Sequence, residues 1–575
     1  MKALKYTIFT LLFGGALTSC NFLDKEPYQL TLSDYFNTAD EANSFLTGIY
    51  AELGQSTFYG ADYMYLVGGD DLSHYGGSGR APATKGLICN NATTSDAAVT
   101  GFWYTLYSGI NRANIFLENI DKVSDIDSGL KAQYTAEARF LRAFYYFNLV
   151  QCWGDVPFKT ESTKDVVGLD IPRTDKQEIY DFIIKEMQEV SDEKTGGLLT
   201  AAKLNYKPGR VSKSAAWGIL ARVYLFRAGE HYREGRNATQ AEKKDYFERA
   251  SFYAQKVMTA GHKLAANYWD PFIDMCSDKY NTTANESIWE AEFAGNNTSD
   301  TQAEGRIGNI IGLAGPDLSS KSDVTGAKDP GYGYAFIYST PKLYNLYVNN
   351  GDTKRFNWSI APFEYKEAGG KNTGVTHREF EQGKLAEVMS QYGQQRGTYQ
   401  YADDTEKTTA TKNFSRMCGK YRREYEADKK DKNYTSINFP ILRYADVLLM
   451  IAEAENEANN GPTTLAYQCM KEVRERAGLN ELPDMTQEEF RQTVKDERAM
   501  ELCFEYTRRF DLIRWGEYVK NMRALVTEAQ SGNNWTQGPT NVYTYFNISS
   551  TYNYFPIPDA EMSVNKDITQ NNPGW

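Results

Sequence analysis

The chain has 575 residues and a mass of 65.2 kDa, enough for a large buried core and for more than one core-forming unit. With 41% hydrophobic residues, 24% charged residues and a mean hydropathy of -0.58, its composition is that of folded soluble proteins. The formal net charge of -12 and the pI near 5.2 argue against nucleic acid or an anionic lipid surface as the partner.

The N-terminus resembles the export signal of a bacterial lipoprotein. Two lysines precede a short apolar stretch over residues 6–17, and the Leu-Thr-Ser-Cys tetrad that ends at Cys20 resembles a lipobox. We predict a signal peptide over residues 1–19, lipidation at Cys20, and a polar tether over residues 20–35; an ordinary cleaved signal is the alternative. No later run approaches the roughly 18 apolar residues of a spanning helix, so the body should be anchored to a membrane without crossing it.

The first helix is predicted by a capping box. Thr38 can accept from the Glu41 amide while the Glu41 side chain reaches back, and apolar residues follow at helix spacing as far as Leu53. Residues 54–100 are rich in Gly, Ser, Asp and Tyr without sustained periodicity, which predicts a long functional or disordered loop. A second helix is expected over residues 103–121.

Residues 136–158 predict the central helix of the scaffold. Apolar side chains recur there at three- and four-residue steps over more than half of the circumference, so this helix should pack on both sides. Gly154 supplies a turn position and Pro157 cannot continue a helix, so the chain should reverse direction soon after Trp153.

Two further helices follow with a repeat-like pattern. Thr174 and Gln177 form a second capping box, and a later helix that begins after Ser212 should close at Gly229. Part of this later region matches the tetratricopeptide signature, with residues 229–241 interrupting it: Trp217, Leu220, Ala221 and Tyr224 in the first half, and Ala250 and Ala254 as small positions of the second.

The predicted fold is mainly α. A tetratricopeptide-like scaffold of helical hairpins covers residues 36–260 and is completed by residues 437–575. Residues 261–436 form a large, irregular, loop-rich insertion with few helices and short strands, because Gly, Asn, Thr, Tyr and Asp dominate there and residues 288–293 alternate like a strand. The helices after the insertion are expected over residues 443–458, 464–477 and 487–504, with Gly478 as a stop.

No motif for catalysis, nucleotide binding or zinc is present, so neither catalytic residues nor a cofactor nor a metal is predicted. A glycosidase could be built from any two of the 75 acidic residues, so that class stays open. The cysteines after Cys20 lack paired spacing and are predicted to be buried free thiols: Cys89, Cys152, Cys276, Cys418, Cys469 and Cys503.

Three carboxylates near the C-terminus lie four residues apart, a spacing that di-metal sites also use. They are Glu497, Glu501 and Glu505. No histidine lies three or four residues away and arginines are abundant, so Glu–Arg pairing between packed helices is the favoured interpretation. Helix caps are favoured over a calcium loop for another acidic group: Asp121, Asp125 and Asp127.

Residues 62–85 are the first place to look for a ligand. Hydrogen-bonding side chains and a tyrosine ring stand there among glycines that let the backbone approach closely, a mixture suited to sugars, although a solvated loop without a ligand is the alternative. Two tyrosines of the insertion are weaker candidates of the same type. The candidates are Asp70, Asp71, His74, Tyr75 and Arg80, with Tyr332 and Tyr334.

Taken in order, several segments resemble the SusD/RagB family of nutrient-binding lipoproteins, and the resemblance covers almost the whole mature chain. They are the lipobox with residues 22–24, then residues 103–114, 136–158, 209–211 with the following helix, 441–449, 473–479, 497–516, 555–558 and 570–575.

The resemblance implies a tetratricopeptide-like scaffold with a variable, loop-rich half that sits on a SusC-like TonB-dependent transporter of the outer membrane, facing the cell exterior. It implies no catalysis, and glycans are the usual cargo, with peptides as the first alternative and a surface glycoside hydrolase as the second. These motifs belong to the scaffold, so no ligand residue is carried over from the family; the position of the 62–85 loop resembles that of part of the site in the starch-binding member.

Overall fold

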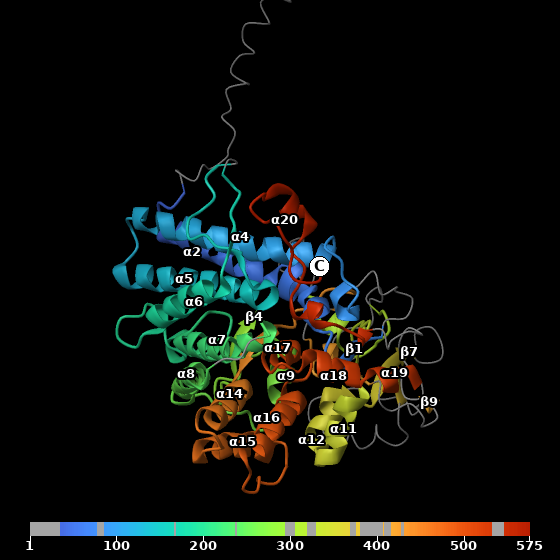
Figure 1. Ribbon diagram of the computed structural model, residues 1–575. Coiled ribbons are helices and arrows are strands. Elements are labelled where there is room, and N and C mark those ends of the chain that lie inside the picture. Colours follow the sequence, from blue (N-terminus) through green and yellow to red (C-terminus); the bar gives the residue numbers. More distant parts are fainter. Residues whose placement is uncertain are drawn as a thin grey trace, which may run out of the picture.

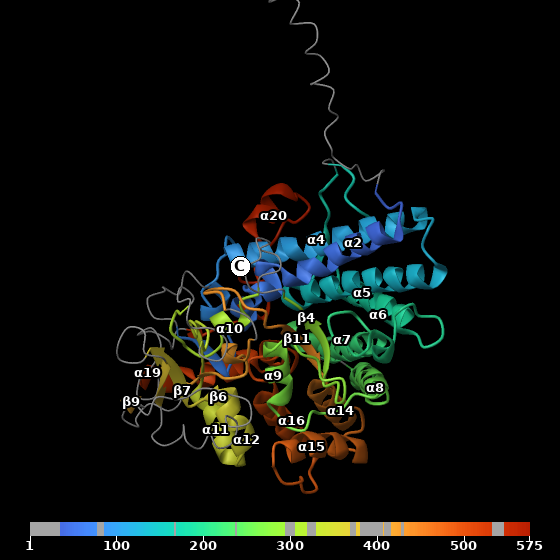
Figure 2. The same ribbon diagram turned by 180° about the vertical axis from the view of Figure 1, so that it is seen from behind.

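One side of the molecule is built from stacked helices and the other from short strands and shorter helices (Figures 1 and 2). Within the described ranges we find no helix that combines the length and the apolar character needed to span a bilayer. The computed structural model describes residues 35–76, 86–165, 168–235, 239–293, 305–318, 329–367, 375–379, 406–407, 416–426, 430–531 and 545–575.

The stacked helices pack mostly against their neighbours in sequence, as a scaffold of helical hairpins requires. Helix α8 packs on α14 although the insertion separates them in the chain, so the scaffold continues on both sides of the insertion. The helices are α2 (Ala39–Tyr50), α4 (Ala97–Asn119), α5 (Ser128–Trp153), α6 (Lys176–Ser191), α7 (Lys213–Arg233), α8 (Gln240–Met258), α14 (Tyr444–Ala458), α15 (Thr464–Arg476) and α16 (Gln487–Leu502).

Helix α5 ends where the sequence predicts. Its aromatic side chains fill the interior, with the Phe144 ring centroid 4.7 Å from that of Trp289, and Gly154 stops the helix with a φ of 75°. The Trp153 indole donates to the Pro556 carbonyl at 2.8 Å, and the Phe555 amide donates to the Cys152 carbonyl at 2.8 Å. The corner is therefore bound to the C-terminal tail.

Local signals are partly confirmed. Thr38 forms the predicted capping box with Glu41. The box predicted at Thr174 is wrong, because Asp175 is the N-cap of α6 and accepts from the Gln177 amide. This correction moves the start of α6 by one residue and does not change the fold.

Helix α7 continues past Gly229 to Arg233, so the predicted stop at that glycine is wrong. A Cβ at Gly229 would lie 2.1 Å from the carbonyl oxygen of Arg514, the last residue of α17 (Arg508–Arg514). Glycine is therefore needed at this position for close packing of two helices rather than for a turn.

The insertion contains the predicted local sheet. Its strand β4 pairs antiparallel with β11 at the entry to α14, and β1, β5, β10 and β6 form a four-stranded sheet in that order. The strands are β1 (Ser73–Tyr75), β2 (Val156–Pro157), β3 (Arg173–Thr174), β4 (Ser287–Ala291), β5 (Ile337–Ser339), β6 (Ile360–Ala361), β7 (Phe363–Glu367), β8 (Val375–Glu379), β9 (Glu406–Lys407), β10 (Met417–Cys418) and β11 (Phe439–Arg443).

Several short helices complete the fold. Among them α11 begins after the N-cap Thr340 with a proline in its first turn and ends at Gly351, which has a φ of 65°. The short helices are α3 (Tyr63–Val67), α9 (Asp270–Cys276), α10 (Ile307–Ile310), α11 (Pro341–Asn350), α12 (Thr353–Ser359), α17, α18 (Tyr518–Ala524), α19 (Val526–Ser531) and α20 (Asp559–Val564).

Within the segment predicted as a long loop over residues 54–100, most of residues 54–76 and 86–89 are instead packed into the core, while residues 90–98 lie mostly near the surface. It contains α3, β1 and short turns of helix, and its aromatic residues contact the scaffold. The Phe58 ring lies 4.9 Å from Phe102, and the Tyr59 ring stacks 4.3 Å from Phe439. Aromatic burial therefore orders a segment whose local sequence lacks periodicity.

The carboxylates of α16 confirm the predicted Glu–Arg pairing. Glu501 is fully buried and contacts Arg443 at 3.2 Å and Arg476 at 2.5 Å. A further cation, Arg355 of α12, was not anticipated; it lies 2.6 Å from Glu497 and 2.9 Å from Glu501. No cluster suited to a metal ion is found in the described ranges.

The predicted buried thiols are confirmed, and the capping role is confirmed for Asp125 and Asp127 but not for Asp121, which forms a 2.7 Å ion pair with Lys131. Asp127 caps α5 through the Gly129 and Leu130 amides at 2.9 Å, and Asp125 accepts from the Ala39 amide at 2.7 Å. The six cysteines after Cys20 are free and buried.

Candidate functional site

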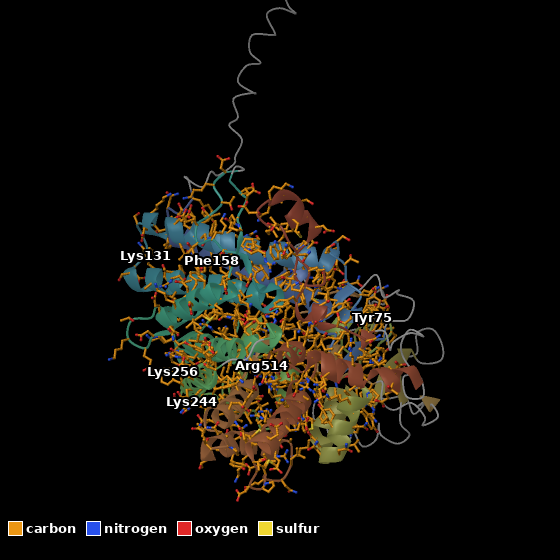
Figure 3. All side chains as sticks on the ribbon, in the orientation of Figure 1. Tyr75, Lys131, Phe158, Lys244, Lys256 and Arg514 are labelled. Carbon is orange, nitrogen blue, oxygen red and sulfur yellow. The ribbon has the colours of Figure 1, made fainter. Side chains whose placement is uncertain are left out.

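The two segments that the sequence singles out for ligand binding lie side by side. Strand β1 pairs antiparallel with β5, with Tyr75 opposite Ile337, and the Gly76 amide donates to the Phe336 carbonyl at 2.8 Å. This pairing places the end of β1 beside the chain that carries Tyr332 and Tyr334. Tyr75 is labelled in Figure 3, on the side of the molecule that carries the short strands.

Asp70 and Asp71 have structural roles. Asp71 is fully buried, accepts from Arg508 at 2.8 and 3.0 Å, and forms an ion pair with Lys342. Burial alone would raise the pKa of Asp71, but the two cations hold it well below its usual range. Asp70 accepts from the Leu72 amide at 2.8 Å, and burial, together with the charge of Asp71, raises the pKa of Asp70 to about 7.

His74 and Tyr75 are also inside the protein. Their exposed fractions are 1% and 0%, and the Tyr75 ring lies 5.8 Å from that of Phe336. Burial of these four candidate side chains argues against the predicted direct contact with a ligand. Arg80 lies outside the described residues.

Tyr332 and Tyr334 are better placed, since both side chains are only partly buried. Their ring centroids are 4.8 Å apart in an edge-to-face arrangement, and Tyr334 stacks on Phe336 with centroids 4.8 Å apart. The three rings form a row although Ala335, between Tyr334 and Phe336, has a φ of 48° and interrupts the extended chain.

Polar groups from two other segments border these rings. The Lys432 ammonium lies 5.3 Å from the Tyr332 ring centroid and forms a 2.9 Å ion pair with Asp317, and the Tyr334 hydroxyl donates to Asn433 at 3.5 Å. The Lys432 and Asp317 side chains are 46% and 33% exposed. We call Tyr332, Tyr334, Asp317, Lys432 and Asn433 the tyrosine platform.

The backbone beneath the platform is held by buried groups. Arg423 donates to the Tyr332 carbonyl at 2.8 Å and pairs with Glu426 at 2.7 Å. The Tyr334 amide donates to the Asn309 carbonyl at 2.8 Å. These contacts fix the direction of the two rings before any ligand arrives, which limits the ordering cost of binding.

The platform combines two kinds of recognition. Its ring faces offer apolar contact to C–H groups, and its carboxylate, amide, ammonium and phenol groups can exchange hydrogen bonds with hydroxyls. Burial and the neighbouring Tyr334 raise the pKa of Tyr332, so its phenol stays protonated at neutral pH and can donate. The sequence does not anticipate Asp317, Lys432 or Asn433, because they come from distant segments and carry no local motif.

Two family profiles match the chain. One, described as the SusD family, matches residues 285–575, and the other, described as "Starch-binding associating with outer membrane", matches residues 21–225. The chain belongs to the SusD family.

Curated relatives match along much of the chain. The SusD-like protein P2 of Formosa agariphila is 25% identical over 589 residues, covering 100% of both chains. The starch-binding protein SusD of Bacteroides thetaiotaomicron is 23% identical over 483 residues, covering 80% of this chain and 76% of its own.

Solved structures show the same fold. A SusD homolog from Bacteroides thetaiotaomicron superimposes with a TM-score of 0.77 at 26% identity, covering 95% of this chain and 99% of that one. A laminarin-binding SusD-like protein superimposes with a TM-score of 0.64 at 22% identity, covering 94% of this chain and 100% of that one. The predicted mainly helical fold with small sheets is thereby confirmed.

Membership of the SusD family sets the class of activity. The family binds glycans at the cell surface and is associated with the outer membrane, and its glycan-binding members are non-catalytic. The chain is accordingly a binding protein of this class rather than a glycosidase.

Proposed function

We propose that this protein captures oligosaccharides or polysaccharides on the tyrosine platform and delivers them to a SusC-like TonB-dependent transporter in the outer membrane. The observation that carries the proposal is the fixed pair of partly exposed rings, Tyr332 and Tyr334, bordered by the exposed Lys432–Asp317 ion pair. Pyranose C–H faces stack on the rings, while Asp317 and Asn433 hydrogen-bond to the sugar hydroxyls.

The proposal places the protein on the outer membrane, lipid-anchored and facing the cell exterior. The lipobox that ends at Cys20 supports this placement, and so does the matching profile whose description names association with the outer membrane. Cys20 itself lies outside the described residues. Labelling cells with palmitate tests the anchor: the wild type should carry label, and Cys20→Ser should lose it.

Electrophoresis through gels containing laminarin, soluble starch or xylan tests capture. We use the soluble form that begins after Cys20, alongside a peptide panel measured by calorimetry. At least one polysaccharide should retard the protein without producing new reducing ends, and Tyr332→Ala combined with Tyr334→Ala should weaken retention about tenfold.

Tyr104→Ala is the matched control, because Tyr104 is 43% exposed on α4, away from the platform. Retention that survives loss of both platform tyrosines would contradict the assignment of the site. Released sugar would contradict the non-enzymatic function, and binding confined to the peptide panel would replace glycans by peptides as the cargo.

Delivery to a transporter is tested by purifying the lipidated protein from native outer membranes under mild detergent. A TonB-dependent transporter should co-purify in a fixed ratio. Purification of the lipidated protein alone would contradict the proposed partnership.

A further inference from the structure

A groove lies on the helical side of the molecule, away from the tyrosine platform. It has a volume of about 420 Å³ and lies between α7 and α8 on one side and α14, α16 and the end of α17 on the other. This volume lies in the range of roughly 300–1,000 Å³ that small-molecule sites usually have. A separate pocket of about 40 Å³ next to β11 is far smaller. We name the larger one the Tyr232 groove after its most exposed ring.

Tyr232 presents a fixed aromatic surface in this groove. Tyr232 is 49% exposed, although its aromatic ring is large and mostly apolar. One part of the ring lies on Gly516, where an added Cβ would be 2.8 Å from the ring carbons, and the His231 ring centroid is 3.9 Å away. Gly516 has a φ of 71°, a conformation that favours glycine, so the backbone is shaped to receive the ring.

A second aromatic side chain of the groove, Trp515, is held by hydrogen bonding and charge. Its indole donates to Glu453 at 2.8 Å, and Lys495 and Arg514 lie 5.2 and 4.9 Å from its ring. Figure 3 labels Arg514 near the middle of the molecule. The groove therefore offers two oriented rings without needing side-chain rearrangement.

Most charges along the groove neutralise one another. Arg491 contacts the two carboxylate oxygens of Glu457 at 2.6 and 2.7 Å, and Lys495 pairs with Glu517 at 2.8 Å. A charged ligand would gain little from such compensated pairs, because each charge already has a close partner. A ligand with many neutral hydroxyls can still use the remaining donors and acceptors.

Lys243 adds one available donor. Its ammonium lies 5.9 Å from the Tyr232 ring centroid and forms no ion pair within the part of the chain that the structure describes. The side chain is partly exposed at the edge of the groove. A donor beside an open ring face suits a sugar, whose hydroxyls project from the rim of an apolar ring surface.

We infer that the Tyr232 groove is a second binding site for a neutral oligosaccharide, separate from the tyrosine platform. The inference rests on the proposed function, since it assigns a further segment of glycan to a glycan-binding protein. The two sites are built from different elements, and a polysaccharide long enough to span both would gain avidity that a short oligosaccharide lacks.

Fluorine NMR on the mature chain labelled with fluorotryptophan tests this site directly. Trp515 lines the groove, and its resonance is assigned by its loss in Trp515→Phe. The protein is titrated separately with maltohexaose, laminarihexaose, cellohexaose and xylohexaose. At least one hexasaccharide should shift the Trp515 resonance saturably, with a midpoint on the order of 1 mM.

Variants identify the group that binds. Tyr232→Ala should weaken the titration about tenfold, and Lys243→Ala, which alters a partly exposed side chain at the edge of the groove, about threefold. The combination of Tyr332→Ala and Tyr334→Ala should leave the Trp515 titration unchanged. Tyr104→Ala is again the matched control, and each variant must keep the melting temperature of the wild type; if Tyr232→Ala does not, Lys243→Ala decides.

The outcomes separate this inference from the proposed function. If the polysaccharide gels show retention that depends on Tyr332 and Tyr334 while Trp515 stays unshifted with all four hexasaccharides, the groove site is overturned and the proposed function stands. If neither retention nor a shift is seen, both are overturned. A Trp515 shift that is unaffected by Tyr232→Ala and Lys243→Ala also overturns the site.

Discussion

The C-terminal halves of helices α5 and α16 both lie in the interior, yet they bind their neighbours in different ways. Helix α5 uses aromatic rings, with Phe147 edge-to-face against Phe226 at 6.2 Å. Helix α16 uses carboxylates, with Glu501 surrounded by Arg355, Arg443 and Arg476. An apolar stripe can pack on any apolar partner, whereas a buried carboxylate needs particular cations in particular places.

The largest expected effect is on α16. Glu501→Gln removes the negative charge that three buried guanidinium groups face, so we expect the free energy of unfolding to fall by about 3–5 kcal/mol. Urea denaturation measures it. Glu475→Gln is the control. Glu475 is exposed and forms a longer, 3.6 Å ion pair with Lys471, so its loss should change the free energy of unfolding by less than about 0.5 kcal/mol. Equal urea midpoints for Glu501→Gln and the wild type would show that the ion pairs do not hold the helix.

A smaller loss of stability is expected from a substitution on α5. Phe144→Ala opens a cavity beside Trp289 and should lower the free energy of unfolding by about 3 kcal/mol, measured in the same urea titrations. Phe144→Leu keeps most of the volume and should cost less than about 1.5 kcal/mol. Similar losses in both variants would mean that ring geometry rather than volume matters at this position.

Acid should distinguish the two helices. The cations around Glu501 outweigh burial and lower its pKa to about 2, so in the folded protein it stays charged while the unfolded chain takes up a proton near its ordinary value. The stabilisation is complete above that ordinary value and is lost as pH falls toward 2, by about 1.4 kcal/mol per pH unit.

Urea titrations at pH 7, 4 and 3 test this difference. The stability gap between the wild type and Glu501→Gln should narrow over that range, while the gap for Phe144→Ala should stay constant because no proton is involved. A gap for Glu501→Gln that does not depend on pH would contradict the electrostatic account.

The contrast also explains what could be predicted from sequence. Helix α5 and its stop at Gly154 follow from apolar spacing and one glycine, both local. Helix α11 was missed although Thr340, Pro341 and Gly351 mark its ends, because it is short and lies within a Gly- and Asn-rich region. Local signals thus identify scaffold helices well and insertion helices poorly.

The candidate site was predictable only in part. Tyr332 and Tyr334 can be chosen from their chemistry, but their neighbour Asn433 lies 99 positions away and no local pattern indicates that contact. Conversely, the glycines near Asp71 predict an open loop, while Arg508, 437 positions away, buries that carboxylate. Long-range contacts therefore decide which polar residues face solvent and which are structural.

The smallest expected effect concerns Asp70 and has the opposite sign to that of Glu501. Burial and the charge of Asp71 raise the pKa of Asp70 to about 7, so the folded state holds a proton that the unfolded chain has released, and stability falls as pH rises from about 4 to 7. Asp70→Asn keeps the Oδ1 acceptor for the Leu72 and Ser73 amides and removes the charge.

We therefore expect Asp70→Asn to match the wild type at about pH 4 and to exceed it by at least about 1 kcal/mol at pH 8, measured by urea denaturation. Asp71→Asn is the informative counterpart, because Asp71 carries the charge that Arg508 and Lys342 require, and it should be destabilising at both pH values. If Asp70→Asn were less stable than the wild type at pH 8, the ionised form of Asp70 would be used by the fold as that of Asp71 is. Asp70 and Asp71 would then both stabilise the fold as charged carboxylates. In that case, burial of a carboxylate would not by itself show whether its negative charge stabilises or destabilises the protein.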